Sequence, residues 1–181
     1  TLDNTGGLIS SQGTLALLDD SADRTLAVTN TGGTLLAGSA LMLRAQRLSG
    51  DGQVRSHGDL ALDLVADFLN TGDITAARAL RLTTAGTVTN DGTLQAGDTL
   101  AIAAQALTNT ATGTLAGDAV DLAITGTLTN RGLIDGGETR IHAGTLDNLG
   151  TGRLYGDHLA LAAGTLNNLA EGGIAPVIAA R

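Results

Sequence analysis

Cysteine, lysine and tryptophan are absent from the 181 residues, and proline, phenylalanine and tyrosine occur once each. Without cysteine the chain can hold no disulfide and no thiolate metal site. This suits a protein that crosses an oxidising compartment unfolded. Aromatic residues normally supply the largest blocks of a globular core. With an aromatic content of 1%, the core must be built from Leu, Ile, Val and Ala on a narrow, regular frame.

Long apolar runs and clusters of positive charge are also missing. No run approaches the roughly 18 residues of a membrane-spanning helix, and no basic stretch precedes an apolar segment as in a signal peptide. Eighteen acidic residues outnumber ten arginines, giving a net charge of −8. This balance disfavours nucleic acid and anionic membranes as partners, because both attract clustered positive charge. The apolar content of 43% excludes a disordered chain.

The sequence contains a repeat of about twenty residues. One asparagine recurs at intervals of 18 to 21 residues after a first interval of 26, and Gly50 fills the single gap. The repeating asparagines are Asn4, Asn30, Asn70, Asn90, Asn109, Asn130, Asn148 and Asn168. Such self-similarity indicates a repeat architecture, in which neighbouring units bury one another.

Apolar residues keep the same places around each anchor. Two residues before it stand Leu2, Val28, Leu48, Phe68, Val88, Leu107, Leu128, Leu146 and Leu166. Four to six residues after it stand Leu8, Leu35, Val54, Ile74, Leu94, Leu115, Ile134, Leu154 and Ile174. An alternating pair follows in most units, for example Leu41 with Leu43. Alternation over short segments is typical of strands with one buried face.

Three short strands per unit, separated by glycine-containing turns, predict a chain that winds into stacked coils. We therefore expect an all-β fold, a parallel β-helix with about 20 residues per coil and eight to nine coils. Parallel crossovers are generally right-handed, so we expect that hand here. Residues 1–181 are expected to form a single β-helix segment. A spacing of about 4.8 Å per coil makes it a rod of roughly 40 Å.

The anchor asparagines share the parity of the inward apolar residues and should therefore point into the coil. A lone buried amide is costly. Stacked at one corner, however, each amide can donate to the next and accept from the previous one, forming a ladder. Asparagine also tolerates the left-handed conformation that a corner can require. Gly50, which replaces one asparagine, can adopt the left-handed conformation at little cost because glycine has no Cβ.

Departures from the period predict loops. The first unit carries about six extra residues, which we place within Asp19–Arg24 and expect to bulge from the rod. Recognition usually sits on loops of a rigid scaffold. The candidate binding residues are therefore Asp19, Asp20, Asp23 and Arg24 in this insertion, together with Tyr155, which lies near the longer turns of the later units.

Chemistry-bearing clusters are sparse. Asp59, Asp63 and Asp67 recur at a spacing of four, which does not converge on one face of a strand and indicates a solvated acidic face. Polysaccharide-acting β-helices need convergent acids and aromatic platforms for sugar rings. Here Phe68 holds an inward position and Tyr155 an outward one. No catalytic residue, metal ligand or cofactor site is expected, and the chain is not expected to be an enzyme.

The repeated phrase itself resembles a known family. It is clearest at Val88–Gly97, Leu107–Asn109 and Leu128–Ile134, and it is similar to the haemagglutinin repeats of filamentous haemagglutinin and of contact-dependent growth inhibition effectors. The resemblance implies a long exoprotein, exported by an outer-membrane two-partner secretion transporter, and secreted or displayed at the bacterial cell surface. It also implies that this chain is a fragment of a repeat shaft.

Three functional hypotheses follow. The favoured one is a rigid shaft of an adhesin or growth-inhibition effector, which mediates cell adhesion or presents a distal receptor-binding or toxin domain. The alternative is that the segment itself binds a host-cell or bacterial surface receptor, or a glycan, through its loops. A polysaccharide-acting enzyme is the least favoured.

Overall fold

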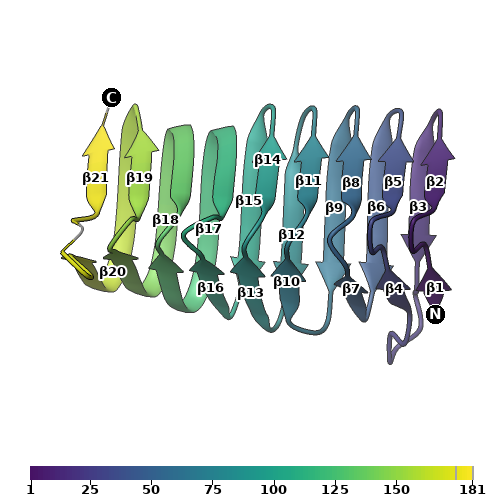
Figure 1. Cartoon of the computed structure of the whole chain (residues 1–181), viewed down its shortest axis with the longest axis horizontal. Helices are drawn as coiled ribbons and strands as arrows, with labels where there is room; N and C mark the ends of the chain where they lie inside the picture. The colour runs from purple at the N-terminus through teal and green to yellow at the C-terminus, as the bar shows by residue number, and fades with distance from the viewer. Residues whose placement is uncertain (174, 181) are drawn as a thin grey trace.

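The computed structural model describes residues 1–173 and 175–180, and it is an all-β parallel β-helix with roughly 20 residues per coil. Eight coils are complete, and a ninth contributes part of its circuit. Figure 1 shows the coils stacked side by side along one axis, with the N-terminus at one end and the C-terminus at the other. The repeat in the sequence thus becomes a rod.

Each coil has three faces. The first carries β1 (Leu2–Asp3), β4 (Ala27–Thr29), β7 (Arg47–Ser49), β10 (Phe68–Asn70), β13 (Thr87–Asn90) and β16 (Ala106–Asn109). The second carries β2 (Leu8–Ser11), β5 (Thr34–Ala37), β8 (Gln53–Ser56), β11 (Asp73–Ala76), β14 (Thr93–Ala96), β19 (Arg153–Gly156) and β21 (Val177–Ala180). The third carries β3 (Thr14–Leu18), β6 (Ala40–Ala45), β9 (Asp59–Leu64), β12 (Leu80–Thr84) and β15 (Thr99–Ala104).

The last coils differ because their strands continue around the corners. β17 (Thr114–Asn130), β18 (Leu133–Leu149) and β20 (His158–Leu169) are single strands where the sequence predicted separate short ones. Backbone pairing survives through these corners, as in the bonds from Gly126 N to Gln105 O and from Ala119 N to Asp98 O, both 2.8 Å. Between Ile124 and Thr127 the register of β17 against β18 shifts, but pairing resumes directly after the corner, so that each remains one strand.

The core is a set of columns that run along the rod. Parallel pairing sets Leu80 beside both Leu60 and Leu100, so that equivalent residues of successive coils stack. These three leucines are at most 1% exposed, and burying a leucine contributes about 1.5–3 kcal/mol. Phe68 also points inward and is buried, as predicted. One coil alone could not bury these side chains, because its neighbours supply the cover.

The predicted inward position of Leu8 is wrong. Its side chain is 65% exposed, and Ile9 instead pairs with Leu35 and joins the column. The same Thr-Gly-Gly turn follows Asn4 and Asn30, which sets the inward residue five positions after both anchors. The spacings of four or six that follow the other anchors therefore do not apply.

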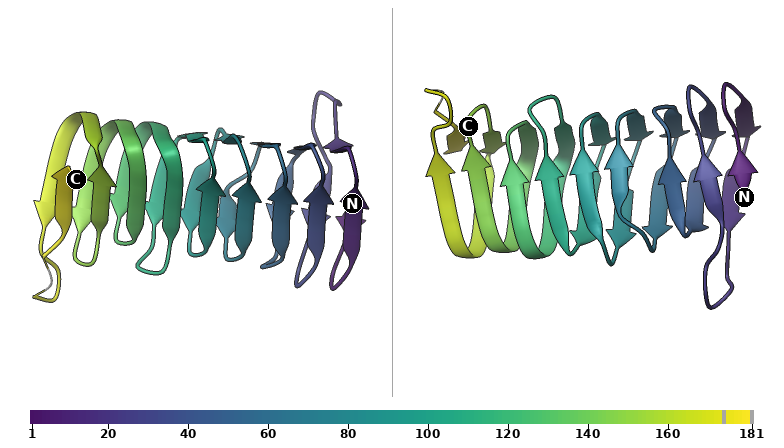
Figure 2. Two further views of the ribbon diagram at one scale, coloured as in Figure 1. Left: turned by 90° about the horizontal axis from the view of Figure 1, so that it is seen from above. Right: turned by 60° about the horizontal axis from the view of Figure 1, so that its bottom comes forward.

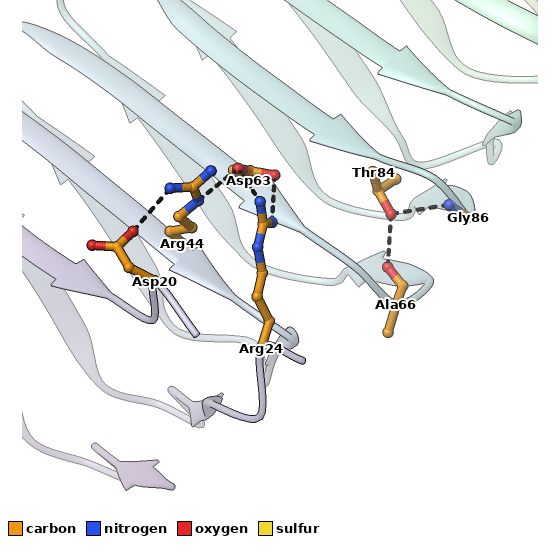
Figure 3. A network of polar contacts seen from close by, with 7 residues as sticks. All are labelled: Asp20, Arg24, Arg44, Asp63, Ala66, Thr84 and Gly86. Carbon is orange, nitrogen blue, oxygen red and sulfur yellow. Dashed lines mark hydrogen bonds and ion pairs between the residues drawn. The ribbon is translucent and has the colours of Figure 1, made fainter. Parts of the chain in front are cut away.

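Two threonines stand in otherwise apolar columns. Thr84 pairs with Leu64, and its hydroxyl donates to Ala66 O at 2.9 Å while accepting from Gly86 N at 3.1 Å (Figure 3). Thr139 is fully buried and donates to Tyr155 O at 2.9 Å. Each hydroxyl bonds to a neighbouring backbone carbonyl, so its burial leaves no unpaired polar atom.

The last strand of the described residues is β21, and Pro176 directly precedes it. A proline is tolerated there because it lies before the ladder of paired residues. Ile174 and Arg181, which the sequence placed in the last unit, lie outside the described residues.

Candidate functional site

The eight anchor asparagines form a column of side-chain amides along the first face. Each Nδ2 donates to the Oδ1 of the next asparagine toward the C-terminus, at 2.8–2.9 Å, except across the gap after Asn30. The second N–H donates to backbone carbonyls, as from Asn109 to Leu133 O at 3.1 Å. Asn90, Asn109 and Asn130 are fully buried. The ladder is a structural device, because stacking satisfies amides that would be costly alone.

Gly50 divides the ladder into two runs. Its φ is +105°, and a Cβ built there would lie 2.6 Å from the backbone of Asn30 and Thr31. No side chain can therefore occupy this corner. Asn30 donates instead to Gln53 O at 3.0 Å, and the first face splits here, since β7 and β10 share no paired residues within the described chain.

Left-handed geometry is not why asparagine occupies the other corners. Among the described residues, Arg24 is the one non-glycine residue with positive φ, at 36°. Four of the anchors are the last residues of ordinary strands, namely Asn70, Asn90, Asn109 and Asn130 of β10, β13, β16 and β17. The hydrogen-bonding capacity of the amide is sufficient reason for the residue.

The six-residue insertion is a loop between β3 and β4. Figure 2 shows it projecting sideways from the rod near the N-terminus. Asp19 organises its interior, because its carboxylate accepts from Thr25 N at 2.6 Å and Leu26 N at 2.8 Å. Hydrogen bonds from the Ser21 hydroxyl, and then from the Leu26 and Ser21 amides, lower the pKa of Asp19 to about 2. Asp19 thus holds the loop together.

A second set of contacts fastens the loop to the next two coils. Arg24 binds Asp63 of β9 through both ends of its guanidinium, at 2.7 and 2.9 Å. Arg44 of β6 bridges Asp63 at 3.2 Å and Asp20 at 2.8 Å (Figure 3). We call these four residues the clasp. Its arginines, Arg24 first, lower the pKa of Asp63.

The three evenly spaced aspartates are therefore more than a solvated acidic face. Asp63 belongs to the clasp, Asp67 accepts from Thr87 N at 2.7 Å, and Asp59 lies 3.5 Å from the Arg78 guanidinium. Each carboxylate links its coil to a neighbouring coil or to the loop. The sequence spacing of four gave no signal for these partners, because they lie on other coils.

The candidate binding residues do not converge on one site. Asp19, Asp20 and Arg24 are engaged within the loop and the clasp, whereas Asp23 is exposed at the tip. Tyr155 lies on β19, toward the opposite end of the rod, half-buried and paired in register with Asp135 and Ala179. The described residues also hold no group of three His, Cys, Asp or Glu side chains placed to bind a metal ion.

Sequence reasoning missed an acidic hollow at the corner between the second and third faces. Its volume is about 420 Å³, and Asp118, Asp135 and Asp157 line it together with Gly136 and Gly137. A Cβ at Gly137 would lie 3.0 Å from Asp118 O and 3.8 Å from Asp157 Oδ2, so the absence of a side chain there helps to keep the hollow open. A recurring Gly-Asp pair at this corner (Gly97–Asp98, Gly117–Asp118 and Gly156–Asp157) was the signal in the sequence.

No family model, no curated protein and no solved structure matches this chain. Among the described residues, no helix is long and apolar enough to cross a membrane. Function must therefore be argued from the rod itself.

Proposed function

We propose that this chain is a stiff spacer in the shaft of a large exported bacterial surface protein. The repeat phrase, which resembles those of filamentous haemagglutinin and growth-inhibition effectors, supports this class. On that basis its export partner is an outer-membrane two-partner secretion transporter, and its place is outside the cell. The shaft would hold a distal adhesive or toxic domain away from the surface.

One observation carries the spacer role: successive coils reuse the same contacts. Val88, Leu107 and Leu128 occupy one core column, and the adjoining asparagines occupy one ladder. Adding or removing such a coil changes the length of the rod without requiring a new kind of contact. A protein that acts through length needs this property, whereas a catalyst needs a unique constellation of side chains.

The test removes one coil in register. Deleting residues 90–108 joins Thr89 to Asn109 and restores the pattern. We expect a folded rod, about 4.8 Å shorter, in the distance distribution from small-angle X-ray scattering. A control deletion of residues 90–98 removes half a coil and should disrupt folding, because outward residues then enter core columns. A compact, non-elongated particle for the parent chain would overturn the proposal.

The alternative function is recognition through the projecting loop, which is favoured by the exposed tip at Asp23 and Ser21. Labelled chain would be titrated onto host epithelial cells and neighbouring bacteria, with unlabelled chain as competitor. Saturable binding that disappears when residues 19–26 are replaced by a short turn would favour a binding module. Absence of binding on both surfaces favours the spacer. The enzymatic alternative would require turnover of a uronic-acid polymer.

A further inference from the structure

The third face presents alanines and charged residues outward. Arg44 and Asp63 of this face belong to the clasp, whereas Arg81 and Asp121 have no ion-pair partner among the described residues. We call the third face the alanine face, defined by the outward residues of its strands. Its middle column is Ala16, Met42, Ala61, Arg81, Ala101, Asp121, Arg140 and Ala160. Between Arg81 and Asp121 lies a shallow hollow of about 90 Å³ over Ala101 and Ala103.

Arg81 and Asp121 are candidates for an external partner. Neither makes an ion pair or side-chain hydrogen bond within the described residues, whereas Arg140 binds Glu138 at 2.7 Å. Both are exposed, and they lie on the same column, one coil to either side of Ala101. Two opposite charges placed symmetrically about a small residue are what a self-complementary surface requires, because a two-fold axis brings residue i of one copy to residue j of the other.

We propose that the alanine face is a self-association surface, on which two copies pack with antiparallel rod axes about a two-fold axis through Ala101. This arrangement sets Arg81 of each copy against Asp121 of the other, so that two ion pairs form. The alternative two-fold arrangement keeps the rod axes parallel and sets Arg81 of one copy against Arg81 of the other. Like charges would then oppose each other, which disfavours that arrangement.

Side-chain size matches along the rest of the column. With the axis through Ala101, the long Arg140 faces Ala61, and Met42, which is 41% exposed, faces Ala160. Long side chains thus meet short ones, as close packing of two sheets demands. On the neighbouring column Asp59 faces Glu138, and each of these carboxylates already has an arginine partner within its own chain.

The size of the surface predicts weak association. Seven strands spaced about 4.8 Å apart, each contributing about five residues, present about 550 Å² per copy. Two copies would bury about 1,100 Å², near the lower end for specific interfaces. A dimer that forms only at high protein concentration is therefore expected. In a shaft, the same contact would bundle neighbouring fibres of opposite direction.

Sedimentation equilibrium tests the proposal with the 181-residue chain. The wild type should show reversible dimers by about 500 µM, and R81D or D121R alone should weaken association about tenfold or more. The double variant R81D/D121R exchanges the charges across the axis and should restore association to within about threefold. Circular dichroism of each variant checks that the coils remain folded.

Three results would overturn it. One is a wild type that stays monomeric throughout the concentration range. Another is a folded double variant that associates no better than the single ones. The third is dependence on the other arginine: if R140D abolishes the dimer while R81D leaves it unchanged, the axis lies between the sixth and seventh coils, where Arg140 faces Asp121. Because the spacer proposal concerns the isolated rod, failure here leaves the result of the coil deletion untouched.

Discussion

The two ends of the rod are built on the same repeat but hold together differently. In the first four coils the asparagine ladder is broken at Gly50, the first face is split between β7 and β10, and a clasp of charged residues ties three coils together. In the later coils the ladder is continuous, and β17 and β18 run through their corners without interruption. The comparison teaches that a coil can lose its ladder rung if other contacts bridge the coils.

The largest expected effect lies in the continuous run. N130A removes the acceptor of Asn109 and leaves Asn148 Oδ1 and Arg153 O without their donor. Because these groups are buried, we expect a loss of about 2–4 kcal/mol in the free energy of unfolding. Urea denaturation followed by circular dichroism measures it.

The matched control for that substitution is N168A at the exposed last rung, which only accepts from Asn148. It should cost no more than about 1 kcal/mol. Equal losses at both rungs would show that the ladder contributes little beyond its individual bonds.

A smaller effect is expected when the gap is filled. G50N adds the missing amide, yet its Cβ would collide with the backbone of Asn30, and its φ would remain positive. The ladder should not re-form, and the free energy of unfolding should fall by about 1–3 kcal/mol.

Gly13, which has open space around it, is the control position for this substitution. G13A should be neutral or stabilising by up to about 1 kcal/mol. A more stable G50N protein would mean that the corner relaxes.

Releasing the clasp should change local protection more than global stability. D63N removes the bidentate partner of Arg24, whose side chain is 21% exposed. Exposed ion pairs contribute about 0.2–1 kcal/mol. Tryptic cleavage after Arg24 should accelerate, because the loop is no longer held against the rod. The control E138Q breaks the pair with Arg140 and should leave that cleavage rate unchanged. An unchanged rate in D63N would mean that Asp19 alone orders the loop.

The smallest effect concerns protonation of Asp19. A carboxylate whose pKa is lowered on folding stabilises the fold above its unfolded pKa, and this stabilisation is lost as the pH falls through the folded value. For Asp19 the window runs from its ordinary value near 3.8 down to about 2. Carboxyl NMR should show a titration midpoint near 2, and S21A should raise it, because the largest cause of the shift is removed. A midpoint near 3.8 in the parent would contradict the loop geometry.

The period explains why so much of the fold was predictable. Columns such as Leu60, Leu80 and Leu100 follow from a constant interval, because equal spacing and parallel stacking place equivalent residues together. Leu8 was misplaced because the parity of a strand depends on the length of the preceding turn. The binding site was the weaker prediction, since Arg24 and Asp63 are 39 residues apart and meet only because the loop folds back. No local pattern encodes that meeting.

The ladder also gives the rod a net dipole along its axis. From Asn70 onward every bonded amide donates toward the C-terminus, so their dipoles align instead of cancelling. Each bond polarises the next and strengthens it. At the start of this run the Oδ1 of Asn70 accepts from Gly72 N at 3.3 Å, and at its end the NH₂ group of Asn168 donates to no described residue. A coil folding onto the last rung meets a donor already in place, so each finished coil is a template for the next.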